Sequence, residues 1–203
     1  VAKIENCSEN NALKNTKEGK IKVVLLGDSI RQIGYGKYVE NKLGDAYQVF
    51  QPEDNSRFVQ YILRQIFEYN DEINGADIAH FNVGLWDVCD IMGDNEPFTP
   101  IDVYVNYVIR IAKNLKARCK TVIFSTTTPV LPQNPYNKNE VIKKFNDAVV
   151  PELKKMGVIV NDLFTLVYND LFKYISSVDY IHLTDEGVAA AGEMITELIK
   201  SVK

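Results

Sequence analysis

KVVLLGDSI, residues 22 to 30, joins a short apolar run to a glycine–aspartate–serine turn. The run is continuous rather than alternating, which is typical of a parallel strand covered on both faces. A serine that follows such a strand lies at its carboxyl end, where open α/β sheets hold their sites. If a helix begins next, its N–H groups and dipole favour a developing oxyanion beside Ser29. Taken alone, the same residues also fit an ordinary turn with a helix-capping serine.

Similar apolar runs recur along the chain and alternate with amphipathic segments. The runs predict strands over residues 22–26, 47–50, 77–82, 121–125 and 158–160. Apolar residues at helical spacing predict helices over residues 58–69, 103–115, 141–153 and 188–202. Pro151 lies inside the third of these helices, and Thr184 is a plausible N-cap for the last. Strands alternating with helices indicate a doubly wound parallel α/β sheet.

The composition is that of one globular domain. The chain has 203 residues, of which 46% are hydrophobic, and a net charge of −4. No basic block occurs, so nothing points to nucleic acid or an anionic membrane as a partner. The apolar runs are too short to span a bilayer. We interpret residues 1–20, which are polar, as an N-terminal leader and residues 21–203 as a single domain.

Cysteine and histidine are scarce. Three widely spaced cysteines argue against a disulfide framework and for a reducing compartment. A cytoplasmic location is therefore expected, with a trimmed secreted form as the alternative. Two histidines leave almost no ligands for zinc, and we expect neither a metal nor a cofactor.

A second motif, Asp179-Tyr180-Ile181-His182, precedes the last predicted helix. A serine hydroxyl is a poor nucleophile until a base takes its proton, and histidine is the usual base. A carboxylate on the other ring nitrogen fixes the tautomer and stabilises the imidazolium. One loop could supply both groups, although a histidine near a helix start beside a solvated aspartate explains the motif equally well.

Together, the two motifs and Gly84-Leu85-Trp86-Asp87 resemble the SGNH (GDSL-like) hydrolase family in order, spacing and placement. The resemblance implies a flavodoxin-like three-layer α/β/α sandwich with a five-stranded parallel sheet of order 2-1-3-4-5. It also implies ester hydrolysis through an acyl-enzyme, without a cofactor. Carried over, Ser29 is the nucleophile, His182 the base and Asp179 the acid that orients it.

The sequence departs from the family pattern at two oxyanion positions. The family has a glycine after the second strand, whereas residues 52–57 contain none, and the backbone N–H of Ser56 is our candidate donor. The third block normally carries an asparagine where this chain has Trp86. We expect Asn82 to supply the side-chain donor in its place, beside the N–H of Ser29. The alternative for Asn82 is a polar residue that merely ends a strand.

Three further side chains are candidates for substrate binding. Arg31 could bind a carboxylate or phosphate of the substrate, or pair with Glu53 or Asp54. Trp86 and Tyr180 flank the motifs and could form an apolar wall for the acyl or alcohol group, although core packing explains Trp86 equally well.

Two more polar residues are expected to be structural. Asp28 is interpreted as bracing the nucleophile turn, and His80 as a hydrogen-bonded core histidine.

These inferences favour a serine carboxylester hydrolase for short acyl groups, with a small-molecule or carbohydrate ester as its partner. The carbohydrate part rests on the family resemblance and on aromatic side chains expected near the site. A lysophospholipase or acyl-thioesterase is the first alternative, but it needs an apolar acyl channel, and residues 90–99 and 133–139 are not notably apolar. The second alternative is a non-catalytic binding protein on the same fold. The oligomeric state is not predicted.

Overall fold

The computed structural model describes residues 19–202, so nearly all of the expected leader lies outside the described residues. Five strands form one sheet of order β2-β1-β3-β4-β5, and every neighbouring pair is parallel. The strands are β1 (Ile21–Leu26), β2 (Tyr47–Phe50), β3 (Ile78–Asn82), β4 (Thr121–Ser125) and β5 (Ile159–Asn161). This is the expected sheet and order, with strand limits within one residue of the prediction.

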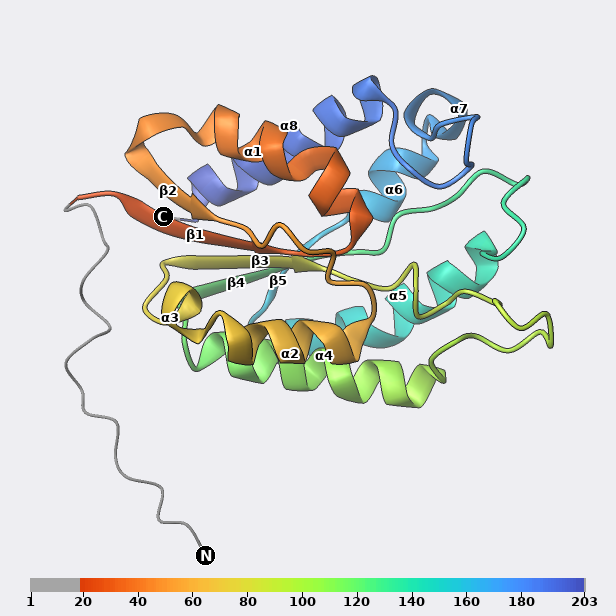
Figure 1. Cartoon of the computed structure of the whole chain (residues 1–203), viewed down its shortest axis with the longest axis horizontal. Helices are drawn as coiled ribbons and strands as arrows, with labels where there is room; N and C mark the ends of the chain where they lie inside the picture. The colour runs from red at the N-terminus through yellow and green to blue at the C-terminus, as the bar shows by residue number, and fades with distance from the viewer. Residues whose placement is uncertain (1–18, 203) are drawn as a thin grey trace, which may run out of the picture.

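Helices cover both faces of the sheet and make three layers (Figure 1). One face carries α1 (Gly36–Leu43), α6 (Leu163–Tyr168), α7 (Leu171–Tyr174) and α8 (Asp185–Ser201). The other face carries α2 (Val59–Glu68), α3 (Asn70–Ile73), α4 (Ile101–Lys116) and α5 (Asn139–Lys155). The expected three-layer α/β/α sandwich is therefore confirmed.

The central strands are apolar because both of their faces are covered. All five residues of β3 are buried, as are the last four of β1, and they form one core with the inner faces of the helices. The four predicted helices correspond to α2, α4, α5 and α8. Pro151 lies inside α5, and the Thr184 side chain accepts a hydrogen bond from the Gly187 N–H at the start of α8, as expected.

The order of the strands determines where a site can form. From β1 the chain runs through α1 to the edge strand β2, and it then returns through α2 to β3 on the other side of β1. A doubly wound sheet opens a crevice at such a reversal, above the carboxyl ends of its strands. Ser29 follows β1 directly, so it lies at this crevice.

Candidate active site

The Gly27–Asp28 turn carries Ser29 out of β1 into a helical segment, η1 (Ile30–Tyr35), which has a wide π-type turn. The segment is kinked at Gly34, whose φ of −107° and ψ of −115° are not helical. The Asp28 carboxylate accepts from the Ile30 N–H at 3.0 Å, and this bond closes the turn. Ser29 precedes the first helical hydrogen bonds, so its own N–H points away from the segment, as the first N–H groups of a helix do.

Three side chains from the two ends of the chain meet above this turn. The Ser29 Oγ lies 2.9 Å from Nε2 of His182, and Nδ1 of the same ring lies 2.8 Å from Oδ2 of Asp179. A ring that donates its Nδ1 proton to Asp179 leaves Nε2 to accept the serine proton. The structure therefore brings together the three residues that the motifs single out, in the order serine, histidine, aspartate.

The loop that carries His182 is held by its own backbone. Ser176 donates its N–H to the carbonyl of His182 at 2.8 Å, and Ile175 forms an antiparallel bridge with Leu183. Tyr180 has a positive φ of 66°, which turns the chain sharply between Asp179 and His182. The turn lets one carboxylate bind both the backbone and the ring of His182.

Asp179 is tuned to remain ionised. Partial burial acts to raise its pKa, but hydrogen bonds from the His182 N–H, the His182 ring and the Ile181 N–H outweigh it and hold the pKa below the ordinary value. A carboxylate that stays charged near neutral pH can stabilise an imidazolium beside it.

Asn82 does not face the crevice as an oxyanion donor, contrary to our expectation. Its Nδ2 donates to Oδ1 of Asp28 at 2.8 Å, and its Oδ1 accepts from the Tyr35 hydroxyl at 2.6 Å. The amide packs directly against Gly27: a Cβ added to this glycine would lie only 2.0 Å from the Asn82 Oδ1. Asn82 therefore supports the Asp28 carboxylate. This role agrees with the alternative interpretation of Asn82 as a polar residue at the end of a strand.

The backbone N–H and the hydroxyl of Ser56 are also taken up by other hydrogen bonds. Its backbone N–H, the expected oxyanion donor, is hydrogen-bonded to the Gly27 carbonyl at 3.0 Å. Its hydroxyl accepts from the Gly27 N–H at 2.9 Å and donates to Oε1 of Gln65 at 2.6 Å. Both groups of Ser56 hold the loop before α2 onto the nucleophile turn, so the assignment of its N–H to an oxyanion is wrong.

Arg31 is not available to a substrate, and neither expected partner pairs with its charge. The side chain is 2% exposed, and its guanidinium donates only to backbone carbonyls, those of Gly27, Pro52 and Asp54. The expectation failed because η1 turns this side chain inward, beneath the loop that follows β2.

Trp86 and Tyr180 remain candidates for contact with a substrate. Trp86 is 44% exposed in the turn after β3, next to the strand that carries Ser29. Tyr180 is half-buried against a small apolar cluster on the His182 loop. Of the two, Trp86 is the more exposed residue, and its indole N–H is a hydrogen-bond donor.

Asp87 is a residue whose position the sequence analysis missed. Its carboxylate accepts from the Thr99 hydroxyl at 2.8 Å and from the Val59 N–H at 3.3 Å, so it joins the loop before α4 to the start of α2. Its place in the Gly84–Asp87 motif was the available signal. Burial raises its pKa to about 7, and the nearby Asp28 acts in the same direction.

Asp28 braces the turn and His80 is a hydrogen-bonded core histidine, as expected, and both are buried. Burial raises the pKa of Asp28 to about 6, against the opposing effects of the Asn82 and Ile30 hydrogen bonds and the Arg31 charge. His80 lies within β3, bonded through Nε2 to the Ser125 hydroxyl at 2.6 Å, and burial lowers its pKa to about 3. Among the described residues, the Ser29 hydroxyl is hydrogen-bonded to His182 and to neither of these two.

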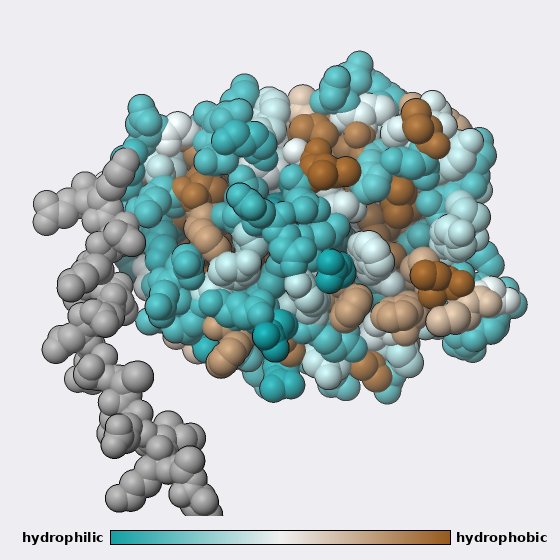
Figure 2. Space-filling view, viewed as in Figure 1, coloured by the Kyte–Doolittle hydropathy of each residue, from teal (hydrophilic) through white to brown (hydrophobic). Residues whose placement is uncertain are grey.

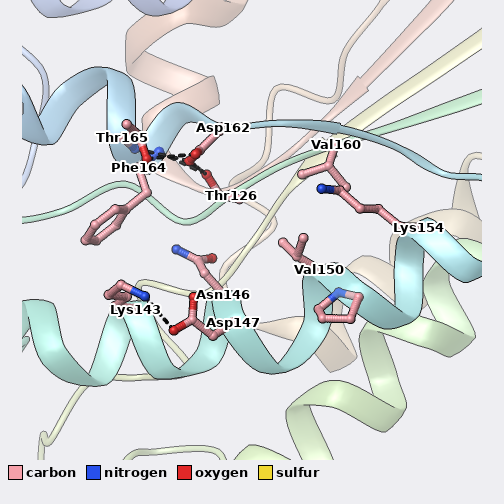
Figure 3. Close-up of a pocket in the computed structure, with 11 residues that line it drawn as sticks. Thr126, Lys143, Asn146, Asp147, Val150, Lys154, Val160, Asp162, Phe164 and Thr165 are labelled. Carbon is pink, nitrogen blue, oxygen red and sulfur yellow. Dashed lines mark hydrogen bonds and ion pairs between the residues drawn. The ribbon is translucent and has the colours of Figure 1, made fainter.

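One hollow near this end of the sheet is separate from the three side chains. It has a volume of about 440 Å³ and lies between α5 and the segment from β5 to α6 (Figure 3). Its walls include the Lys143–Asp147 ion pair and the Phe164 ring, but not Ser29, Asp179 or His182.

Two general properties of the described residues bear on the site. No helix among residues 19–202 is long and apolar enough to cross a bilayer. Within the same residues, no three histidine, cysteine, aspartate or glutamate side chains gather in a group that could hold a metal ion.

Sequence comparison finds no matching family model and no matching curated protein. Comparison of structures finds close likenesses. An acetylxylan esterase from Geobacillus stearothermophilus superimposes with a TM-score of 0.70 at 17% identity, over 91% of this chain and 96% of that chain. A second acetyl xylan esterase gives a TM-score of 0.73 at 16% identity, over 88% and 100% of the two chains. A GDSL-like lipase from Bacteroides thetaiotaomicron gives 0.67 at 16% identity, over 90% and 89%. At these identities, the likenesses show a shared fold.

Proposed function

We propose that this chain is a serine esterase that cleaves carboxylic esters with short acyl groups. The observation that carries the proposal is the unbroken chain of hydrogen bonds from Ser29 through His182 to Asp179, at 2.9 and 2.8 Å. This constellation activates a serine in unrelated folds, so its geometry is an argument independent of the fold.

The groups in place define the steps of the reaction. As the Ser29 oxygen attacks the ester carbonyl carbon, its proton passes to Nε2 of His182, and the imidazolium is stabilised by Asp179. The imidazolium then protonates the leaving alcohol, and the acyl group remains on Ser29. Water repeats the sequence, giving its proton to His182 and releasing the carboxylic acid and the free serine.

Negative charge on the carbonyl oxygen needs preorganised donors. The Ser29 N–H is our first candidate, because it lies at the start of η1. Since the amide of Asn82 and the N–H of Ser56 are already hydrogen-bonded, the Trp86 indole is the remaining side-chain candidate from the family-like motifs.

Labelling of the nucleophile tests the proposal directly. We expect a fluorophosphonate to modify Ser29 alone, as mapped by mass spectrometry, and Ser29→Ala to be unlabelled and inactive on 4-nitrophenyl acetate. An adduct on Ser56 or Ser125, or no adduct at all, would contradict the assignment. Binding of an ester without turnover by the wild type would instead favour a non-catalytic binding protein.

A carbohydrate acetyl ester is the substrate that we favour. Two proteins that share the fold are described as acetylxylan esterases, and Trp86 offers an exposed ring beside the turn. Release of acetate from acetylated xylo-oligosaccharides, compared with 4-nitrophenyl acetate, tests this choice of alcohol.

One observation favours a longer acyl group. The loop between β3 and α4 exposes Ile91, Met92 and Phe98, and apolar side chains gather where this loop projects, at the lower right of Figure 2. Turnover of 4-nitrophenyl esters of increasing chain length discriminates between the two substrates. We expect turnover to fall beyond about four carbons, because a CH₂ gains its ~0.8 kcal/mol only when it is removed from water, and Ile91, Met92 and Phe98 are themselves exposed. A preference for octanoyl esters would favour the lysophospholipase or thioesterase alternative.

A further inference from the structure

Arg31 is a buried cation with an unusual set of partners. Among the described residues, no carboxylate lies within 4.0 Å of its guanidinium, although the side chain is almost fully buried. The carboxylates of Asp28 and Asp54 favour the charged form of Arg31 only from beyond this distance. Burying a charge is expensive unless its hydrogen bonds are satisfied, and here Nη1 and Nη2 are bonded whereas Nε has no partner among the described residues. The side chain therefore calls for an explanation other than an ion pair.

Its hydrogen bonds join two segments that are distant in the sequence. Nη1 donates to the Pro52 carbonyl at 2.7 Å, while Nη2 donates to the carbonyls of Asp54 at 2.8 Å and Gly27 at 3.2 Å. One planar fork thus binds the loop after β2 and the nucleophile turn at the same time. Ser29 is two residues from both Gly27 and Arg31, inside the clamped turn.

Two glycines make room for this side chain. A Cβ on Gly27 would lie 2.8 Å from the Arg31 Cβ, and a Cβ on Gly36 would lie 2.7 Å from its carbonyl oxygen and 3.1 Å from its Cδ. Real Cβ atoms essentially never approach another heavy atom within 3.0 Å, so neither position accepts a larger residue without a shift of Arg31. The Gly36 N–H donates to the Arg31 carbonyl, so the wide turn of η1 is closed around the same residue.

Ser56 ties the same two segments together without a charge. It donates its N–H to the Gly27 carbonyl and accepts the Gly27 N–H on its hydroxyl. The Gly27 carbonyl therefore accepts from both Ser56 and Arg31, which uses both of its lone pairs. The two ties are independent in their chemistry but hold one interface.

We propose that Arg31 is a positioning residue for the esterase reaction: its guanidinium fixes the loop of residues 52–56 against the Gly27–Ser29 turn and so sets the position of the nucleophile. The proposal rests on the proposed function of Ser29, whose oxygen must approach the substrate and the His182 ring within a narrow range of geometry. A displacement of about 1 Å in such a constellation costs about 10² in rate.

The planar fork, and not the charge alone, is the property required. Lysine carries the same charge on a single nitrogen, so it cannot reproduce two nitrogens that bind carbonyls on two segments. Arg31→Lys should therefore behave like Arg31→Ala in turnover. We expect kcat for 4-nitrophenyl acetate to fall about 10²-fold in both variants, with KM within about threefold of the wild type, because the contact with substrate is unchanged.

Chemical rescue separates positioning from a loss of stability. Added guanidinium chloride, at concentrations below those that unfold the protein, should restore kcat of Arg31→Ala by about tenfold, because it can rebind the vacated carbonyls. Ammonium chloride should restore nothing. Arg118→Ala is the matched control, since Arg118 also clamps oxygen atoms of two segments, Asn70 and Asn114, but lies before β4, at the opposite end of the parallel sheet. It should keep its kcat.

If the Arg31 variants do not fold, Ser56→Ala tests the same contact between the loop of residues 52–56 and the nucleophile turn. It loosens the same interface without burying or removing a charge, so kcat should fall by at least tenfold with KM unchanged. The proposal is overturned if folded Arg31→Lys retains wild-type kcat, if guanidinium fails to rescue a folded Arg31→Ala, or if Ser56→Ala is fully active. A wild type that neither hydrolyses esters nor is labelled at Ser29 would overturn the proposed function as well, whereas a labelled, active wild type confines any failure to Arg31.

Discussion

Two carboxylates lie near the Ser29–His182 pair, and their hydrogen bonds give them different tasks. Asp179 binds the imidazole directly, and three hydrogen bonds keep its pKa low. Asp28 accepts from the Ile30 N–H and the Asn82 amide, is buried, and has one oxygen without a partner among the described residues. The first carboxylate can stabilise an imidazolium, whereas the second supports the turn.

Asp179→Asn should therefore abolish most activity and leave the fold intact. An amide at this position favours the wrong histidine tautomer, and the expected loss in kcat is about 10⁴-fold. Thermal unfolding should change little, because Asp179 is half-exposed. The isosteric Asp28→Asn is the matched control, and it should affect stability more than turnover. A stable but inactive Asp28 variant beside an active Asp179 variant would reverse the two assignments.

Asn82→Ala should act chiefly on stability, in contrast to what the sequence alone suggested. The substitution leaves the Tyr35 hydroxyl and the Asp28 carboxylate without their buried partner. Each unsatisfied buried group costs about 1–3 kcal/mol, so for two groups we expect the free energy of unfolding to fall by about 2–6 kcal/mol. Chemical denaturation measures this change. An Asn82→Ala variant that keeps its stability but loses turnover would show that Asn82 is the oxyanion donor after all.

At the scale of elements, the strands and long helices could be predicted because the spacing of their apolar residues reflects which faces are buried. A parallel strand covered on both faces reads as a mostly apolar run, and the Val23–Leu26 part of β1 is the clearest case. Helices α1, α3, α6 and α7 were not predicted, since four to eight residues are too few to show a clear helical period.

The candidate site divides in the same way. Ser29, Asp179 and His182 could be identified because each belongs to a short motif next to a predicted element. The oxyanion donors could not, because a donor is free only if no other group has taken it. The partner of Asn82 is Tyr35, 47 residues away, and that of Ser56 is Gly27, 29 residues away. The prediction that Arg31 binds substrate failed for a similar reason, because the direction of its side chain depends on the wide turn of η1.

The contact between α7 and α8 should control the position of His182. The loop that carries this histidine leaves α7 and returns to α8, and the Tyr174 carbonyl at the end of α7 accepts from the Thr184 N–H at 2.9 Å. Gly187, in the first turn of α8, packs so closely there that an added Cβ would lie 2.3 Å from that carbonyl oxygen. The first turn of α8 therefore tolerates no side chain at this position.

Gly187→Ala should weaken both stability and turnover. Overpacking of this kind costs about 1–3 kcal/mol, and any shift of α8 also moves the His182 loop. Ala190→Gly, in the same helix, lowers stability by about 1 kcal/mol through helix propensity alone. Comparison of kcat for the two variants at matched stability tests the argument. Equal activity would show that the loop does not depend on this contact.

For the molecule as a whole, the buried acids near the site make stability depend on pH. Burial raises the pKa of Asp28 to about 6 and that of Asp87 to about 7, both above the value of an unfolded aspartate. The folded chain therefore holds protons that the unfolded chain has lost between about pH 4 and pH 7, so these two groups make stability fall as pH rises through this range. His80 acts in the opposite direction, because its lowered pKa makes the folded chain lose stability as pH falls.

Asp87→Asn isolates one of these contributions, because an amide cannot titrate. The amide oxygen can still accept from Thr99 and Val59, so the two loops stay joined. The unfolding free energy of the variant, relative to the wild type, should rise from about pH 4 to pH 7, by on the order of 1 kcal/mol per pH unit. The contribution of His80 is the same in both proteins and cancels in the difference. Thermal unfolding of both proteins across this range measures the trend. A difference that does not change with pH would mean that Asp87 ionises in the folded protein as readily as in the unfolded chain, and a difference that falls would mean that its charged form is stabilised by the fold.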